Sequence, residues 1–217
     1  MTIEMNESLT AVPNAELQYN ILPLFSMPVI ISQEEYKFNK KELKFVKSLA
    51  KKPNMLNNYS QNTEVLNSPE LSQLKDYLQK WVNIYAHNFL KIKNSVTEFY
   101  ITQSWCNYNI KGEGHHFHNH PNSLISGVFY IQGENSPIEF KRNEKIFPFD
   151  FVYDSFDLYN SASYWVDLEV GKLFLFPSSL VHSVRENMSK KTRISLSFNT
   201  FTKGVLGEKE KLTLVHI

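Results

Sequence analysis

Four of the seven histidines of this chain fall within six residues, in the segment GEGHHFHNHP at 112–121. Side chains alternate between the two faces of a strand, so His116, His118 and His120 are predicted to point the same way. Neutral imidazole is a common protein ligand for zinc, copper and iron, and two rings two residues apart can reach one ion from the same side. The segment is therefore interpreted as metal-binding, and spacing alone leaves open which two of the three histidines coordinate.

A further histidine lies in a second candidate segment, FPSSLVHSV at 176–184. A lone histidine in a strand is usually structural, but His182 belongs to a β-rich region that already needs another metal ligand. A sandwich or barrel can bring its strand across to the first cluster, and this context favours His182 as the distal ligand. His87 and His216 stand alone and are interpreted as packed or surface residues.

The third candidate segment, TRISLSFN at 192–199, alternates strictly between polar and apolar residues. The usual interpretation is a strand with its apolar face buried and its polar face in water. A ligand-holding barrel reverses this arrangement, because its lumen carries the polar groups and its outer face packs on helices. An arginine fork such as Arg193, backed by the hydroxyl of Ser195, suits a carboxylate. The pattern alone favours neither interpretation.

Two regimes of residue pattern must position these segments. Up to about residue 95 the periodicity is helical, with one helix predicted over 40–51. A second begins at Ser68-Pro69-Glu70, with serine as the cap and proline at the first helical position. From Thr97 the chain changes to short segments rich in β-branched and aromatic residues, which predicts a sandwich or barrel. The predicted strands lie near 98–109, 114–120, 123–132, 137–141, 171–176, 181–185 and 192–201.

Composition and charge bound the class of protein. Its 217 residues predict one domain, and 23 basic against 22 acidic side chains argue against a nucleic-acid partner. The single cysteine, Cys106, excludes an internal disulfide framework. The first twenty residues do not resemble a signal peptide, and the apolar run at 22–31 is too short to span a membrane. We therefore expect a soluble cytoplasmic protein without a membrane partner.

Taken together, these segments resemble the iron(II)/2-oxoglutarate-dependent oxygenases. His118-x-His120, His182 and an arginine eleven positions later, Arg193, match the layout of that family. The resemblance is greatest to a subfamily of these oxygenases that is found in marine bacteria and their phages. It rests on HNHPNSLISGVFYI, GKLFLFPSSLVHSV and TRISLSFNT, with a weaker similarity in the early LPLFSMPV.

The resemblance implies a fold and a domain layout. The fold is mainly β, a double-stranded β-helix (jelly-roll) core with flanking N-terminal α-helices. The chain is then a single domain over 1–217, with supporting helices in 1–95, the β-helix core in 96–201 and a tail at 202–217.

The resemblance also implies roles for residues. His118 and His182 would ligate iron, with His120 at the position where most of the superfamily has an acid. The third ligand could instead be His116, a distant acid or water. Arg193 would bind the distal carboxylate of 2-oxoglutarate with help from Ser195. Further cosubstrate or lumen candidates are Tyr130, Tyr108, Asn107 and Asn199.

The activity implied is an Fe(II)- and 2-oxoglutarate-dependent dioxygenase that uses O2 and hydroxylates an unidentified substrate, releasing succinate and CO2. Two alternatives remain: a cupin-like three-histidine dioxygenase without 2-oxoglutarate, and a non-catalytic metal- or small-ligand-binding jelly-roll module. The Arg193–Ser195 pair argues against the first alternative, since such an enzyme needs no clamp for a dicarboxylate. Substrate contacts are expected from loops, here 54–67 and 143–163, whose composition identifies no chemical class.

Overall fold

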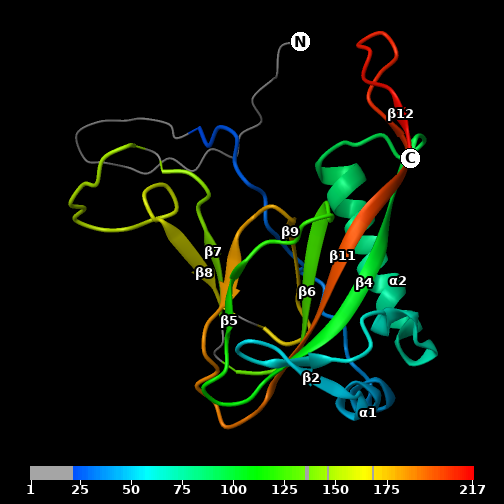
Figure 1. The fold of residues 1–217 in the computed structure, drawn as a ribbon, viewed down its shortest axis with the longest axis vertical. Coiled ribbons are helices and arrows are strands. Elements are labelled where there is room, and N and C mark those ends of the chain that lie inside the picture. Colours follow the sequence, from blue (N-terminus) through cyan, green and yellow to red (C-terminus); the bar gives the residue numbers. More distant parts are fainter. Residues whose placement is uncertain (1–21, 135–136, 146, 168) are drawn as a thin grey trace.

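Two antiparallel sheets face each other, and helices cover the outer face of the larger one (Figure 1). The computed structural model describes residues 22–134, 137–145, 147–167 and 169–217. Residues 1–20, for which the sequence predicts no targeting signal, lie outside this part of the chain. The architecture confirms the predicted double-stranded β-helix with helices packed outside it.

The strands and helices are as follows. The larger sheet holds, in spatial order, β1 (Ile30–Ile31), β9 (Leu173–Pro177), β6 (Ile125–Gln132), β11 (Arg193–Leu206), β4 (Thr97–Asn109), β3 (Asn58–Ser60) and β2 (Lys51–Pro53), with β12 (Val215–His216) paired to β11. The smaller sheet holds β5 (His115–His118), β10 (His182–Val184), β7 (Ile138–Lys141) and β8 (Ser163–Val166). The helical elements are α1 (Lys40–Ser48), the 3-10 turns η1 (Val65–Asn67) and η2 (Pro69–Leu71), α2 (Ser72–Asn83) and the π-helical η3 (Ile84–Phe89).

All seven predicted strands are present within a few residues of their expected bounds. The sequence pattern does not predict β1, β2, β3, β8 and β12, each of two to four residues, because such short strands leave too few positions for alternation to show. Two of them, β2 and β3, fall within or beside the segment at 54–67 that the sequence predicts as a loop.

The helices begin as local chemistry dictates, with one exception. Asn39 caps α1 through a complete capping box: its side chain accepts from the Glu42 amide while the Glu42 carboxylate accepts from the Asn39 amide. Ser68 does precede the second helix, but its side chain makes no capping hydrogen bond, and the chain passes through the 3-10 turn η2 before α2 begins. Ser68 therefore holds the predicted N-cap position, ahead of Pro69, but of the 3-10 turn η2 and without a capping hydrogen bond from its side chain.

The alternation along β11 now has one interpretation. Ile194, Leu196 and Phe198 pack with the apolar residues of α2, such as Leu74 and Leu78, in one buried core. The polar residues of β11 face the opposite way, into the space between the two sheets. The structure thus has the arrangement of a ligand-holding barrel, with a polar lumen and an apolar outer face under the helices.

Two segments differ from their predicted roles. The core was expected to end at residue 201, but β11 continues to Leu206 because β4 extends equally far, with Thr202 paired to Phe99. Residues 202–217 are therefore a strand end and a hairpin closed by β12. The segment at 143–163 leads from β7 to β8 at the edge of the smaller sheet (Figure 1).

Among the described residues, no helix is long and apolar enough to cross a membrane.

Gly127 on β6 gives a first testable prediction. A β-carbon at this position would overlap the ring of Phe198, which is 1% exposed and has no room to move. Gly127→Ala is therefore expected to lower the free energy of unfolding by about 1–3 kcal/mol, as overpacking of cores generally does. Urea denaturation measures this, and adding Phe198→Leu should recover part of the loss. A Gly127→Ala variant as stable as the parent would contradict this packing.

Candidate metal and carboxylate site

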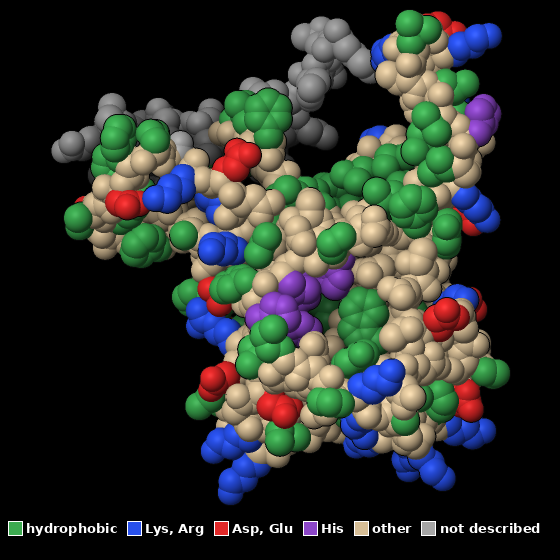
Figure 2. Space-filling view, in the orientation of Figure 1, with side chains coloured by type: hydrophobic (Ala, Val, Ile, Leu, Met, Phe, Trp, Pro, Cys, Tyr) green, Lys and Arg blue, Asp and Glu red, His purple; other side chains and the backbone are tan. Residues whose placement is uncertain are grey.

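Three histidines from separate parts of the chain meet between the sheets. His118 lies on β5 directly opposite His182 on β10, and His120 follows β5. One ligand nitrogen from each lies within 4.8 Å of the other two, and the Nε2 atoms of His120 and His182 are 3.3 Å apart. In Figure 2 histidine side chains border a hollow on this face of the molecule.

Backbone contacts orient two of these rings. The Nδ1 atom of His118 lies 2.8 Å from the carbonyl oxygen of His116, and that of His182 lies 3.0 Å from the carbonyl of Leu180. A carbonyl only accepts, so each Nδ1 carries the proton and each Nε2 keeps its lone pair. The amide of His120 donates to Ser178, which ties the residue to the turn before β10. This arrangement is typical of histidines that bind metal through Nε2.

The site favours neutral imidazole. Burial lowers the pKa of His118, and it lowers the pKa of His120 to about 4 and that of His182 to about 3, with nearby imidazoles adding to the effect. All three rings are therefore neutral near pH 7, the form that binds metal. Two ligand nitrogens bound at right angles to one ion at about 2.1 Å would be about 3 Å apart, close to the separation of the His120 and His182 nitrogens. The residues thus fit a single metal ion.

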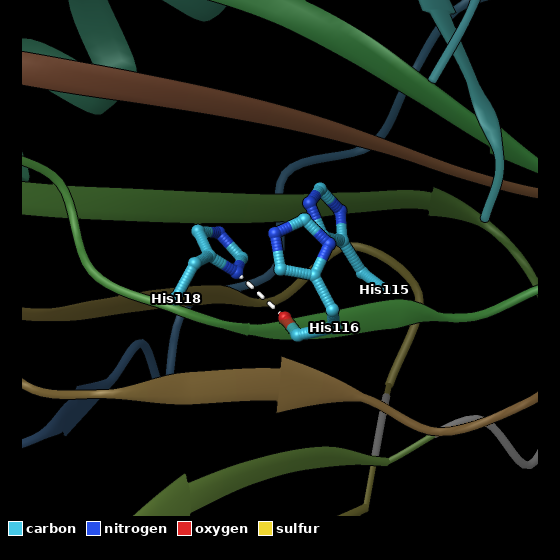
Figure 3. Close-up of side chains that lie close together, drawn as sticks. All are labelled: His115, His116 and His118. Carbon is cyan, nitrogen blue, oxygen red and sulfur yellow. Dashed lines mark hydrogen bonds between the residues drawn. The ribbon is translucent and has the colours of Figure 1, made fainter. Parts of the chain in front are cut away.

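A bulge decides which neighbour of His118 faces the site. His118 pairs with His182, and His115 pairs with Val184. Over this stretch β5 therefore contains one residue more than β10, which is a β-bulge. As a result His115 lines the pocket and His116 does not, which contradicts the predicted alternation. The ring of His115 stacks on that of His118 with centroids 4.3 Å apart (Figure 3). His115, His116 and His118 also form a second group of close ligand atoms.

Arg193 adds a buried positive charge to the pocket that the neutral histidines line. It is 2% exposed, and its Nη2 donates to Asn109 Oδ1 at 2.6 Å. Its Nε and Nη1 are buried without a hydrogen-bond partner, and so is the hydroxyl of Tyr130. Burial lowers the pKa of Arg193 and raises that of Tyr130 to about 12, although the arginine charge partly offsets the latter. Unpaired buried donors are costly, which indicates an acidic ligand.

The predicted cosubstrate residues separate into two groups. Ser195 lines the pocket and lies across from Tyr130 on β6 and Asn107 on β4. Asn199 is not among the residues that line it, and its Oδ1 accepts from the Ser126 hydroxyl at 3.3 Å. Asn199 lies six residues along β11 from Arg193, too far along the strand to join the same group.

Tyr108 does not lie where the prediction of a cosubstrate contact requires. Its hydroxyl donates to the backbone carbonyl of Val46 at 2.6 Å, within the core under the helices. Side chains alternate along β4, so Asn107 and Asn109 face the lumen and Tyr108 must face α1. Asn109, which lies opposite Arg193, was not among the predicted site residues. The sequence could have indicated it, because Asn109 is two residues from Asn107 on the same strand and therefore points to the same side.

The remaining wall of the pocket is neutral. The Nδ2 atom of Asn107 donates to the Ser197 hydroxyl at 3.0 Å, and the ring of Trp105 lies beside that of His120. No acidic residue of the described chain lines the pocket, so no carboxylate there replaces His120 as a ligand. The described part of 143–163 contributes no residue to the lining either. The complete lining is Trp105, Asn107, His115, His118, His120, Gly127, Val128, Ile138, Phe176, His182, Val184, Arg193, Ser195 and Ser197.

Comparisons with known proteins place this geometry in context. Residues 103–199 match a family model described as putative 2OG-Fe(II) oxygenase. An oxidoreductase of the 2OG-Fe(II) oxygenase family from Burkholderia pseudomallei is 12% identical, with a TM-score of 0.55 over 79% of this chain and 83% of its own. HygX from Streptomyces hygroscopicus, solved with nickel, 2-oxoglutarate and hygromycin B bound, is 11% identical, with a TM-score of 0.56 over 80% and 82%. A search of the curated proteins found no match.

Proposed function

We propose that this chain, whose residues 103–199 match the putative 2OG-Fe(II) oxygenase family model, hydroxylates a substrate C–H bond while converting 2-oxoglutarate and O2 to succinate and CO2. In this proposal His118, His120 and His182 hold Fe(II), and Arg193 with Tyr130 and Ser195 holds the distal carboxylate of 2-oxoglutarate. Bound Fe(II) would supply the redox chemistry of this reaction, in which one oxygen atom of O2 goes to the substrate and the other to succinate.

The buried, unpaired face of Arg193 carries the proposal. A guanidinium removed from water without a counter-charge destabilises the fold unless a ligand completes it. Nε and Nη1 have no partner while Nη2 donates to Asn109, so the guanidinium keeps unused N–H donors for a carboxylate. The phenol of Tyr130 adds another unused donor. A cupin-like dioxygenase without 2-oxoglutarate would have no use for this set.

The metal ligands differ from the usual set in charge. Three neutral imidazoles leave the ion one unit more positive than two histidines and a carboxylate would. This difference favours an anionic cosubstrate in the remaining positions. The pocket lining, which includes Trp105, Asn107 and Ser197, supplies no carboxylate of the protein that could compete for the metal.

Succinate formation tests the proposal. The purified protein is incubated with Fe(II), 2-oxoglutarate and O2, with and without a library of candidate substrates, and succinate is quantified. In parallel, thermal unfolding is followed with Ni(II), which does not support turnover, and increasing 2-oxoglutarate. Turnover together with 2-oxoglutarate-dependent stabilisation is expected. Stabilisation without turnover would favour a non-catalytic binding module. The absence of both turnover and stabilisation would rule out 2-oxoglutarate as the ligand.

Tyr130→Phe tests the carboxylate clamp in a graded way. Removing one hydroxyl hydrogen bond is expected to weaken 2-oxoglutarate binding by roughly 2- to 12-fold, the equivalent of about 0.5–1.5 kcal/mol. The free protein should be no less stable, because the hydroxyl has no partner to lose. Calorimetric titration with 2-oxoglutarate measures the affinity. A stability loss at unchanged affinity would place the hydroxyl outside the clamp.

A further inference from the structure

Much of the excess positive charge of this chain lies in one segment. Between residues 37 and 52 there are seven lysines and one glutamate, a net charge of +6, so the rest of the chain carries −5 against the total of +1. The near-neutral net charge of the chain therefore conceals a positive segment and an acidic remainder. The lysines are Lys37, Lys40, Lys41, Lys44, Lys47, Lys51 and Lys52, here called the lysine face.

These lysines have no ionic partners among the described residues. All seven are exposed, and each ion pair of the described chain involves a different basic residue. The one acid among them, Glu42, is 1% exposed and accepts from the Tyr36 hydroxyl and the Asn39 amide. Its carboxylate is thus directed inward, and the charged side chains exposed within residues 37–52 are all positive.

The fold arranges part of this charge as a stripe. Lys40, Lys44 and Lys47 share one face of α1 and line a shallow hollow together with Leu43 and Ser48. The stripe is about 10 Å long at 1.5 Å per residue. Lys51 and Lys52 extend it onto β2. Figure 2 shows basic side chains over the region where Figure 1 places α1 and β2.

The composition of the stripe distinguishes between kinds of acidic partner. Interfaces between proteins are depleted in lysine and are anchored by aromatic residues and arginine in a dry centre. No arginine occurs in 37–52, and its only aromatic residues, Phe38 and Phe45, are partly buried rather than exposed. Lysine binds phosphate as a point charge and needs no such anchor. The face therefore suits a phosphate backbone better than an acidic protein.

We propose that the lysine face on α1 and β2 binds the phosphodiester backbone of a nucleic acid, without base readout. This inference is independent of the oxygenase chemistry, because none of its residues lines the pocket that holds Arg193 and the histidines. It replaces the expectation from total charge that nucleic acid is not a partner.

Salt-dependent binding of DNA tests the proposal. Fluorescence polarisation of a labelled single-stranded 20-mer is measured between 50 and 200 mM salt. With about four phosphate contacts, the affinity should fall about 50-fold over this range. The triple variant Lys40→Gln, Lys44→Gln, Lys47→Gln keeps similar helix propensity and should reduce the slope of log K against log salt by about 2.

A matched control removes the same charge elsewhere. Lys93, Lys190 and Lys209 are exposed and outside the lysine face, so their replacement by Gln should leave most of the DNA affinity. Equal losses in both triple variants, or no binding at 50 mM salt, would overturn the proposal. Tighter binding to polyglutamate or to phosphatidylserine vesicles at equal charge would also overturn it, assigning the face to an acidic protein or a membrane. Unchanged circular dichroism shows that the variants are folded, and succinate formation is scored separately.

Discussion

Replacing Arg193 with methionine is expected to weaken 2-oxoglutarate binding by roughly 30- to several-thousand-fold, as loss of a buried charged contact of about 2–5 kcal/mol does. The same change should raise the melting temperature of the ligand-free protein. The native guanidinium is 2% exposed, with two nitrogens unpaired, so methionine removes an uncompensated buried charge and retains most of the volume. Opposite signs for binding and stability distinguish a ligand-binding residue from a structural one.

Arg185→Met is the matched control. Arg185 lies outside the pocket, pairs with Glu139 at 3.2 Å and packs over the Trp165 ring. Its removal should leave 2-oxoglutarate affinity unchanged and should not raise the melting temperature. If Arg193→Met lowered the melting temperature and bound 2-oxoglutarate normally, Arg193 would have a structural role and the cosubstrate would bind elsewhere.

Replacing His182 with alanine is expected to reduce metal affinity by more than about 100-fold, beyond the 10–100-fold usual for residues that only support a ligand. His182 has its Nδ1 held by the carbonyl of Leu180 and its ligand nitrogen close to those of His118 and His120, so its removal takes away one of the three proposed ligands. Competition of Fe(II) or Co(II) against a chromophoric chelator under anaerobic conditions measures the affinity, independently of turnover.

The same measurement decides the third ligand. His120→Ala should weaken metal binding severely, whereas His120→Asp should retain it, because the aspartate would create the two-histidine, one-carboxylate set common among such oxygenases. His116→Ala should bind metal normally, since His116 does not line the pocket. Normal binding by His120→Ala with loss in His115→Ala or His116→Ala would move the ion to the second histidine group.

The sequence predicted that these histidines come together because the prediction needs only side-chain type and coarse spacing. His118, His120 and His182 converge, and Arg193 lies in the same pocket, as a barrel with these strands requires. The polar face of β11 was ambiguous in the pattern. It was resolved only by α2 packing on the other face.

Details that depend on partner strands could not be predicted. The bulge in β5 exists only relative to β10, so alternation counted along one strand named His116 where His115 faces the pocket. The face of Tyr108 follows from the phase of β4, which Asn107 and Asn109 together would have fixed. The lysine face was concealed by a total charge that carries no positional information.

If Arg193 binds 2-oxoglutarate as proposed, its unpaired guanidinium would link the lifetime of the folded protein to a metabolite. A ligand that binds only the folded state adds RT ln(1 + [L]/Kd) to stability, about 2.7 kcal/mol when its concentration is 100 times Kd. In a cell short of 2-oxoglutarate, more molecules would therefore open and be degraded, and abundance would fall along with activity. One side chain would then set both how fast the enzyme works and how much of it persists.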